Sequence, residues 1–167
     1  RFRVDEGAAA WFGRVSVEKG IEEFLALDLP GTRLVVGDGP ATEKLRGKYP
    51  GVVFTGYRFG DELARHVAAA DVFVFPSRTD TFGLVLLEAM ACGVPVAAYP
   101  VTGPIDVVVN GVTGVLSEDL RTAALAAINL DRHACREHAL RYTWEAASRQ
   151  FVASLAPVDC RPAATIS

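Results

Sequence analysis

Short apolar runs alternate with longer amphipathic stretches along most of the chain, and glycine or proline often separates them. Runs such as residues 34–36 and 72–75 are rich in β-branched and aromatic side chains, which favours strands. Strands are predicted at residues 10–14, 32–37, 51–55, 71–75, 95–99 and 113–116. Helices are predicted at residues 18–27, 40–48, 60–69, 84–92, 118–129, 131–141 and 143–156, with a weaker helical turn at 104–109.

The apolar character of the predicted strands is nearly continuous, which indicates burial on both faces of the sheet. We therefore expect an α/β fold, a three-layer Rossmann-like domain with a six-stranded parallel sheet and helices on both faces. Right-handed crossovers would bring the carboxyl ends of the strands to one edge, where ligands bind in such sheets. This domain is assigned to residues 10–156, with a linker at 1–9 and a tail at 157–167.

Composition narrows the function classes. The chain has 167 residues, of which 50% are hydrophobic and 22% charged, enough for one domain with a core. A net charge of −3 argues against a general nucleic-acid binder. The three cysteines are odd in number and form no CxxC pair, so a reduced cytoplasmic compartment is expected rather than a disulfide scaffold.

The most informative segment is residues 75–93, where a buried strand, a polar loop and a helix follow one another. A helix that begins near Gly83 would aim the amide N–H groups of its first turn at a ligand above the sheet edge, as anion sites do. Glu88 is an acidic residue within an otherwise apolar helix. It is either a salt-bridged core residue or an acceptor for the hydroxyl groups of a bound polyol such as ribose.

Two further segments carry candidate binding residues. Asp80 precedes the same helix and is either a turn residue or a second polar contact for the same ligand. At the end of the first strand, Gly13 permits close approach, and Arg14 with Lys19 supplies cations for a diphosphate. The alternative is that both cations are ordinary solvated surface residues.

Two other patterns invite site assignments that the residues do not support. The glycine turn of residues 36–40 fails the dinucleotide fingerprint GxGxxG, because Thr42 stands where the third glycine is needed. His133, Cys135 and His138 suggest zinc, but the two histidines are five positions apart on different helix faces and no fourth ligand is evident. No metal site is therefore expected.

Taken together, the segments resemble the C-terminal domain of the large retaining glycosyltransferase family called family 4, which has the GT-B fold. The resemblance covers about residues 10–155 and rests on motifs in the same order and spacing. The matching motifs are Gly13-Arg14 to Lys19-Gly20, Val36 to Pro40, Val52 to Gly56, Ala70 to Ser77, Asp80 to Val96, Gly111 to Gly114, and Trp144-Glu145. One departure is Asp80, which replaces the first glutamate of the family's E-x7-E motif.

The resemblance implies a role for each candidate residue. Arg14 and Lys19 would hold the diphosphate of a nucleotide-sugar donor, and Glu88 its ribose. Asp80 would contact sugar hydroxyls, one methylene shorter than usual. The sugar and the distal phosphate would lie near the N–H groups of Phe82, Gly83 and Leu84. The base would lie near Gly56, Tyr57 and Arg58. Gly13 and Gly39 would belong to the turns beside the donor.

The resemblance also implies the reaction. Departure of a nucleoside diphosphate develops negative charge, which metal-dependent enzymes often stabilise through a DxD motif that this chain lacks. Arg14, Lys19 and the helix start at residue 83 could stabilise that charge without a metal or cofactor. The donor would be a UDP- or GDP-sugar, with GDP-mannose suggested by similar loops in bacterial mannosyltransferase-like members, and transfer would be retaining.

The expected partners are the nucleotide sugar, a glycan or lipid acceptor, and an N-terminal GT-B domain that this chain lacks and without which it would be inactive. A cytoplasmic location is expected, and membrane association would come through that other domain. Three alternatives stay open at this stage. They are a non-catalytic nucleotide or sugar-phosphate binding module, a nucleotide-sugar epimerase of related fold, and a flavodoxin-like signalling domain, which would carry an acidic cluster at the strand ends.

Overall fold

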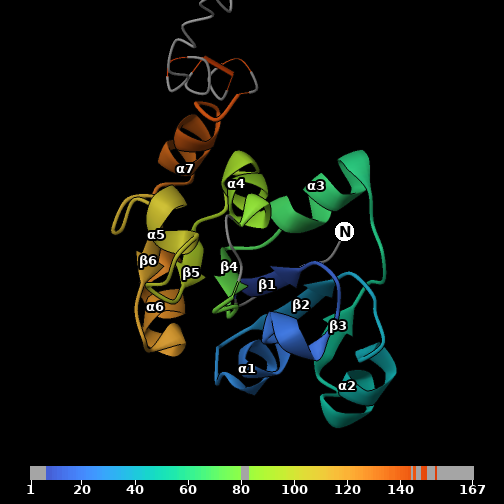
Figure 1. The fold of residues 1–167 in the computed structure, drawn as a ribbon. Helices are drawn as coiled ribbons and strands as arrows, with labels where there is room; N and C mark the ends of the chain where they lie inside the picture. Colours follow the sequence, from blue (N-terminus) through green and yellow to red (C-terminus); the bar gives the residue numbers. More distant parts are fainter. Residues whose placement is uncertain (1–6, 80–82, 144, 146–147, 150–152, 154–167) are drawn as a thin grey trace, which may run out of the picture.

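The computed structural model describes residues 7–79, 83–143, 145, 148–149 and 153 (Figure 1). Six strands form one sheet in which every pairing is parallel and the order is β3-β2-β1-β4-β5-β6. The strands are β1 Ala8–Phe12, β2 Thr32–Val36, β3 Val52–Phe54, β4 Val72–Phe75, β5 Val96–Ala98 and β6 Gly114–Leu116. The predicted six-stranded parallel sheet is confirmed.

Helices cover both faces of the sheet, as predicted (Figure 1). One face packs against α1 Ile21–Ala26, α2 Thr42–Lys48 and α6 Leu120–Ala127. The other face packs against α3 Gly60–Ala68, α4 Leu84–Ala91, α5 Pro104–Val107 and α7 Arg132–Ala139. Within the described residues, no helix combines the length and the apolar character that crossing a membrane requires.

The two-residue repeat of the first strand separates the two halves of the core. Ala8, Ala10 and Phe12 pack with the α3 and α4 side, whereas Ala9 and Trp11 pack with the α1 side. All five side chains are at most 4% exposed. Small alanines let the helices approach the centre of the sheet closely, while Phe12 and Trp11 fill the space near its carboxyl edge.

Several boundaries differ by one or two residues from the sequence prediction, and two differences change the description of the fold. The first strand begins at Ala8 rather than residue 10, so residues 8 and 9 belong to the core and not to the expected linker. Alanine carries little strand signal, which explains the miss. The helix expected at 18–27 is divided into a short 3-10 helix, η1 Val17–Lys19, and α1, because Gly20 adopts a left-handed conformation with φ 66°.

Some predictions fall beyond the described part of the chain. Most of the predicted helix at 143–156 and all of the tail at 157–167 lie outside the described residues, as do residues 80–82. The weak helical turn expected at 104–109 is confirmed in shortened form as α5.

The strand order places a switch point between β1 and β4. From β1 the chain proceeds outward through β2 and β3, and from β4 it proceeds outward in the opposite direction through β5 and β6. The connections that follow β1 and β4 therefore diverge over opposite faces and leave a crevice at the carboxyl ends, where ligands of this sheet type bind.

The contact between β1 and β4 is reinforced from α7. The Ala8 N–H donates to Asp71 Oδ2 at 2.7 Å, and the Asp71 N–H donates to the Ala8 carbonyl at 2.8 Å. The Arg132 guanidinium lies 3.8 Å from Asp71 Oδ1 and donates to the carbonyl groups of Ala70 and Ala68, at 2.6 and 2.8 Å. One arginine thus ties α7 to the end of α3 and to the centre of the sheet.

Replacing Arg132 by alanine should lower the free energy of unfolding by about 1–2 kcal/mol, because two charge-assisted hydrogen bonds are lost. The value lies at the low end for such bonds because the side chain is 43% exposed. Denaturant unfolding measures the change. Arg65→Ala, which removes an exposed arginine from α3, is the control and should change stability by less than about 0.5 kcal/mol. Equal losses in the two variants would contradict the assignment.

Candidate functional site

Two adjacent pockets open at the carboxyl ends of the strands, at the switch point of the sheet. The larger has a volume of about 250 Å³ and the smaller about 110 Å³. The larger pocket is lined by Phe12, Gly13, Arg14, Val36, Gly37, Tyr57, Arg58, Leu63, Val85 and Glu88. The smaller pocket is lined by Trp11, Phe12, Gly13, Arg14, Lys19, Phe75 and Val85. The shared residues make the two pockets parts of one site.

The floor of the site is two loops in direct backbone contact. The Gly13 N–H donates to the Val36 carbonyl at 3.1 Å, and the Val15 N–H donates to the Asp38 carbonyl at 3.0 Å. A Cβ atom at Gly37 would lie 1.9 Å from the Gly13 carbonyl oxygen, and one at Gly39 would lie 2.2 Å from that of Val15. Both glycines are therefore needed for the two loops to approach each other.

This geometry gives Gly39 a role that the sequence prediction did not include. Its N–H points to Asp38 Oδ1 at 2.7 Å and to Thr42 Oγ1 at 3.0 Å, so the amide already has acceptors within the chain. Gly39 lines neither pocket. The structure thus assigns it to loop packing, and direct contact with a ligand stays a prediction.

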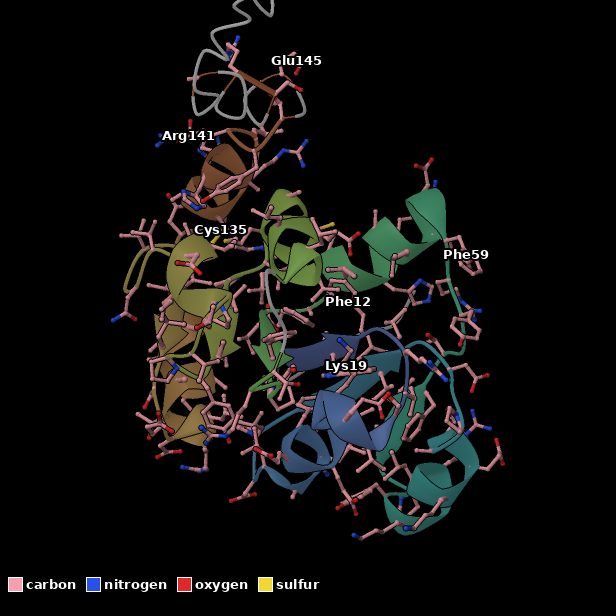
Figure 2. The ribbon with its side chains drawn as sticks, in the orientation of Figure 1. Phe12, Lys19, Phe59, Cys135, Arg141 and Glu145 are labelled. Carbon is pink, nitrogen blue, oxygen red and sulfur yellow. The ribbon has the colours of Figure 1, made fainter. Side chains whose placement is uncertain are left out.

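The two predicted cations lie beside this floor. Arg14 follows Gly13 directly, is exposed, and lines both pockets. Lys19 lines the smaller pocket from the last residue of η1, just before Gly20, rather than from the first turn of a longer helix as expected. In Figure 2, Phe12 and Lys19 lie in the region between α4 and α1. The structure therefore brings both cations to one pocket.

Glu88 reaches the larger pocket from the middle of α4. Leu86, Ala89 and Met90 form the buried side of this helix, whereas Glu88 is on its exposed side. Of the two alternatives given for Glu88, the salt-bridged core residue does not fit this position, because its side chain is exposed and the apolar surface around it faces the pocket. Its apolar surroundings still desolvate it enough to raise the pKa of the Glu88 carboxyl above the ordinary value.

The anion site predicted at the start of α4 stays a prediction. Gly83 caps the helix in a left-handed conformation with φ 71°, and the Leu86 N–H of the first turn donates to the Gly83 carbonyl at 2.8 Å. Leu84 is 66% exposed at this start. Asp80 and Phe82, predicted for the same region, lie outside the described residues.

The opposite wall of the larger pocket comes from the loop after β3. Gly56 has φ 72° and forms an isolated bridge with Gly37, which fixes the loop against the floor of the site. Tyr57 is 53% exposed and stacks on Phe59, with ring centroids 6.1 Å apart. Arg58 stands between these two residues in the sequence. Its guanidinium donates to the Tyr57 carbonyl at 2.8 Å and pairs with the Glu62 carboxylate at 3.1 Å. Phe59 itself lies at the beginning of α3 (Figure 2).

The three residues considered for zinc have separate surroundings. His133 is exposed and lies 3.6 Å from Glu137. The Cys135 thiol is buried, which raises its pKa to about 11, and it donates to the Thr113 carbonyl. His138 Nε2 lies 2.9 Å from the Val107 carbonyl oxygen. Within the described residues, no three histidine, cysteine, aspartate or glutamate side chains gather into a metal-binding group.

Sequence reasoning missed several residues of the site. Val36, Leu63 and Val85 line the larger pocket with ordinary apolar side chains that carry no local signal of binding. Gly37 could have been found, because it ends a predicted strand and belongs to the same turn as Gly39. Arg58 was not missed, since the resemblance places it near the base, and it adds a third cation to the pocket walls.

Comparison with known proteins assigns the chain and its fold to a family. The family described as glycosyl transferases group 1 matches residues 8–131. Sulfoquinovosyl transferase SQD2 of Arabidopsis thaliana is 39% identical over 159 residues, which cover 83% of this chain and 31% of that protein. A GDP-mannose-dependent alpha-mannosyltransferase of Corynebacterium glutamicum is 36% identical over 159 residues, which cover 87% of this chain and 38% of that protein.

Solved structures agree. Sucrose-phosphate synthase from Thermosynechococcus elongatus superposes with a TM-score of 0.74 and 31% identity, over 92% of this chain and 47% of that chain. HepE of Anabaena, solved with UDP-glucose, shares the fold at 22% identity and a TM-score of 0.69, over 90% of this chain and 50% of that chain. The chain spans about a third of the length of the curated relatives named above. The match over most of its residues, together with the parallel sheet and the site at its switch point, shows that this chain belongs to the glycosyl transferases group 1 family as a GT-B domain.

Proposed function

We propose that this chain is the donor-binding domain of a retaining, metal-independent glycosyltransferase of family 4. It binds a UDP- or GDP-hexose, with GDP-mannose as one candidate, and another domain supplies the acceptor site for a glycan or lipid. Arg14 and Lys19 hold the diphosphate, and Glu88 accepts hydrogen bonds from the ribose. Tyr57 lies beside the base. The proposed location is the cytoplasm.

One observation carries this proposal: two cations and one carboxylate meet at a divided site. Arg14 and Lys19 line the smaller pocket, while Arg14 and Glu88 line the larger one. A diphosphate needs cations and amide donors, and a ribose needs a strong acceptor, so the arrangement matches the two ends of one nucleotide. The same assignment is supported by the match to the glycosyl transferases group 1 family and by the similarity to a GDP-mannose-dependent alpha-mannosyltransferase.

The proposed chemistry follows from charge. As the bond between sugar and diphosphate breaks, negative charge grows on the leaving phosphate. Arg14, Lys19 and the amide groups at the start of α4 stabilise that charge without a metal. The sugar would bind at the same helix start, the family resemblance suggests Asp80 as a contact for its hydroxyls, and the remaining contacts would orient the anomeric carbon toward the acceptor.

Calorimetry on this chain with UDP, GDP, UDP-glucose and GDP-mannose tests donor binding. The domain should bind at least one diphosphate and should show no transfer alone, because the acceptor site is supplied elsewhere. Transfer that appears when the chain is joined to an N-terminal GT-B domain separates a transferase from a non-catalytic nucleotide-binding module. Absence of binding to every diphosphate would refute the proposal.

Glu88→Gln tests the ribose contact. A neutral amide accepts hydroxyl hydrogen bonds less strongly than a carboxylate, so the affinity for nucleoside diphosphate should fall by about 1 kcal/mol, or roughly fivefold. The loss should shrink for a 2′,3′-dideoxyribose diphosphate, which lacks the partner hydroxyls. Melting temperature should change little. Unchanged affinity for both ligands, with a lower melting temperature, would make Glu88 a structural residue.

The raised pKa of Glu88 predicts a pH dependence of binding. Ribose hydroxyls favour the carboxylate, so binding releases the proton and lowers the pKa again. Affinity should be constant above the raised pKa and fall as the pH decreases through it, beginning at a higher pH than for an ordinary glutamate. Titration from about pH 7 to about pH 4 measures this. The Glu88→Gln variant shows how much of the pH dependence comes from titration of the ligand's phosphates. Parallel curves of affinity against pH for the two proteins would show that Glu88 does not cause the pH dependence.

A further inference from the structure

Thr42, the first residue of α2, closes a small ring of hydrogen bonds with Asp38 and Gly39, here called the Asp38–Thr42 ring. The Gly39 N–H lies 2.7 Å from Asp38 Oδ1 and 3.0 Å from Thr42 Oγ1, and both oxygens accept from it. The Thr42 hydroxyl donates in turn to the Asp38 carboxylate, and this bond, with the one from Gly39, holds the pKa of that carboxyl below its ordinary value. Thr42 is 3% exposed, so a buried hydroxyl closes the ring. The ring therefore fixes the connection between β2 and α2.

The same connection holds the backbone directly after Arg14. The Val15 N–H donates to the Asp38 carbonyl at 3.0 Å, and the Val15 carbonyl accepts from the Ala41 N–H at 3.4 Å. Gly39 packs so closely against Val15 that a Cβ atom at Gly39 would lie 2.2 Å from the Val15 carbonyl oxygen. The peptide group that joins Arg14 to Val15 thus takes its position from a residue of the ring.

The Asp38–Thr42 ring acts on the site through these backbone contacts and not through its own side chains. No member of the ring lines either pocket, whereas Arg14 is exposed and lines both. A guanidinium bonds a phosphate within a narrow range of distances, so a displaced backbone leaves fewer side-chain conformations of Arg14 that reach the phosphate. The ring therefore determines how well Arg14 is placed.

Lys19, the other cation of the smaller pocket, is held by different contacts. Its N–H donates to the Ser16 carbonyl at 3.3 Å. A Cβ atom at the next residue, Gly20, would lie 2.9 Å from the Pro76 carbonyl oxygen, so this end of η1 packs against the segment that follows β4. These contacts do not include the ring, and Lys19 can therefore serve as an internal control for Arg14.

We propose that Thr42 and Asp38 are positioning residues, whose ring fixes the backbone beside Arg14 and thereby places the Arg14 guanidinium for the diphosphate of a nucleotide. This inference rests on the proposed function, in which Arg14 holds the diphosphate. Affinity for a nucleoside diphosphate then depends on the ring, whereas affinity for the nucleoside alone does not. The dependence disappears when Arg14 is replaced, because the ring then has no guanidinium to place.

Calorimetry on the whole chain with UDP or GDP, whichever binds the wild type more tightly, and with the corresponding nucleoside tests the role of the hydroxyl. Thr42→Val keeps the shape of the side chain and removes the hydroxyl, so diphosphate affinity should fall roughly threefold to tenfold while nucleoside affinity stays the same. Thr42→Ser retains the hydroxyl and should stay near wild type. The matched control is Thr122→Val, because the Thr122 hydroxyl donates to Asp119 at the start of α6, in a similar pair that lines neither pocket. Its loss should leave both affinities unchanged.

A second pair of variants tests the carboxylate. Asp38→Asn keeps an oxygen that can accept from Gly39 and from Thr42, whereas Asp38→Ala removes it. Both variants remove the same negative charge, so a general gain in affinity for an anion is common to both. Diphosphate affinity should therefore be lower in Asp38→Ala than in Asp38→Asn, by roughly threefold or more. The pair gives an independent measurement should Thr42→Val fail to fold.

A double-mutant cycle identifies the residue through which the ring acts. In the Arg14→Ala protein, Thr42→Val should cause no further loss of diphosphate affinity. In the Lys19→Ala protein it should cause the full loss seen in the wild type, since Lys19 is held by other contacts. A purely structural role for Thr42 would give the same loss in both backgrounds.

The outcomes separate the two levels of inference. If the wild-type chain binds diphosphate and Thr42→Val binds it equally well, or if Asp38→Ala and Asp38→Asn bind it equally well, the positioning role is overturned and the proposed function stands. The role is likewise overturned if diphosphate and nucleoside affinities fall by the same factor, or if the loss persists undiminished in the Arg14→Ala protein. A wild-type chain that binds no nucleoside diphosphate would overturn both the positioning role and the proposed function.

Discussion

Replacing Gly37 by alanine should destabilise the protein by more than about 4 kcal/mol, the largest effect expected of any single substitution described here. The added Cβ would lie 1.9 Å from the Gly13 carbonyl oxygen, in backbone that cannot move aside without breaking the hydrogen bonds between the two loops. The φ of +147° at Gly37 adds strain for any residue with a side chain. Denaturant unfolding followed by circular dichroism measures the loss.

Gly47→Ala is the matched control for this prediction. Gly47 lies within α2, and a Cβ there would meet nothing within 4 Å. Alanine is the better helix former, so this variant should gain about 0.5–1 kcal/mol. The two glycine substitutions should therefore shift stability in opposite directions. A Gly37→Ala protein with the unfolding midpoint of the wild type would show that the two loops do not require their close contact.

Arg14→Ala and Lys19→Ala should each weaken nucleoside-diphosphate binding by about 1.5–3 kcal/mol, which is more than tenfold. Both residues line the smaller pocket, and each substitution would remove a proposed charge-assisted bond to phosphate there. Affinity for the nucleoside alone should hardly change, because it lacks the diphosphate. Calorimetry with both ligands checks the difference.

Lys44→Ala provides the control for these variants, because Lys44 is an exposed cation of α2 that lines neither pocket. Lys44→Ala removes one positive charge, as the other two substitutions do, so a general electrostatic effect would appear equally in all three variants. Melting temperatures of all variants should stay close to that of the wild type. Unaltered diphosphate affinity in both Arg14→Ala and Lys19→Ala would remove the phosphate assignment.

The sheet was predictable because most strands are marked by β-branched runs bounded by glycine or proline. The exception was β1, which begins with three alanines from Ala8 onward. Alanine packs well at the centre of a sheet but has no strand preference of its own. The interruption at Gly20 was also missed, since a glycine within an amphipathic pattern is compatible with a continuous helix until its close contact with Pro76 is known.

The site was predictable where a charged residue follows a strand, because parallel strands deliver such residues to one edge. Arg14 and Lys19 illustrate this, and Glu88 was found as a charge in an apolar helix. What could not be predicted depends on contacts between distant backbones. The role of Gly39 against Val15 is of this kind. So is the exposure of Glu88, because the pattern of a helix does not reveal which of its apolar sides faces a pocket.

The central pair of strands has a consequence for the behaviour of the folded protein. Ala8 and Asp71 meet at the junction of β1 and β4 although they are 63 positions apart in the chain. The two pockets lie at the opposite, carboxyl end of the same two strands, and they are lined by Arg14, which follows β1, and by Val85, which follows β4. A ligand that binds there would connect the two strands without a covalent bond. It would raise the free energy of unfolding by about 2.7 kcal/mol at a ligand concentration 100 times its Kd. For the nucleotide sugar proposed as ligand, its concentration in the cell would then set how well the two halves of the sheet resist separation and proteolysis.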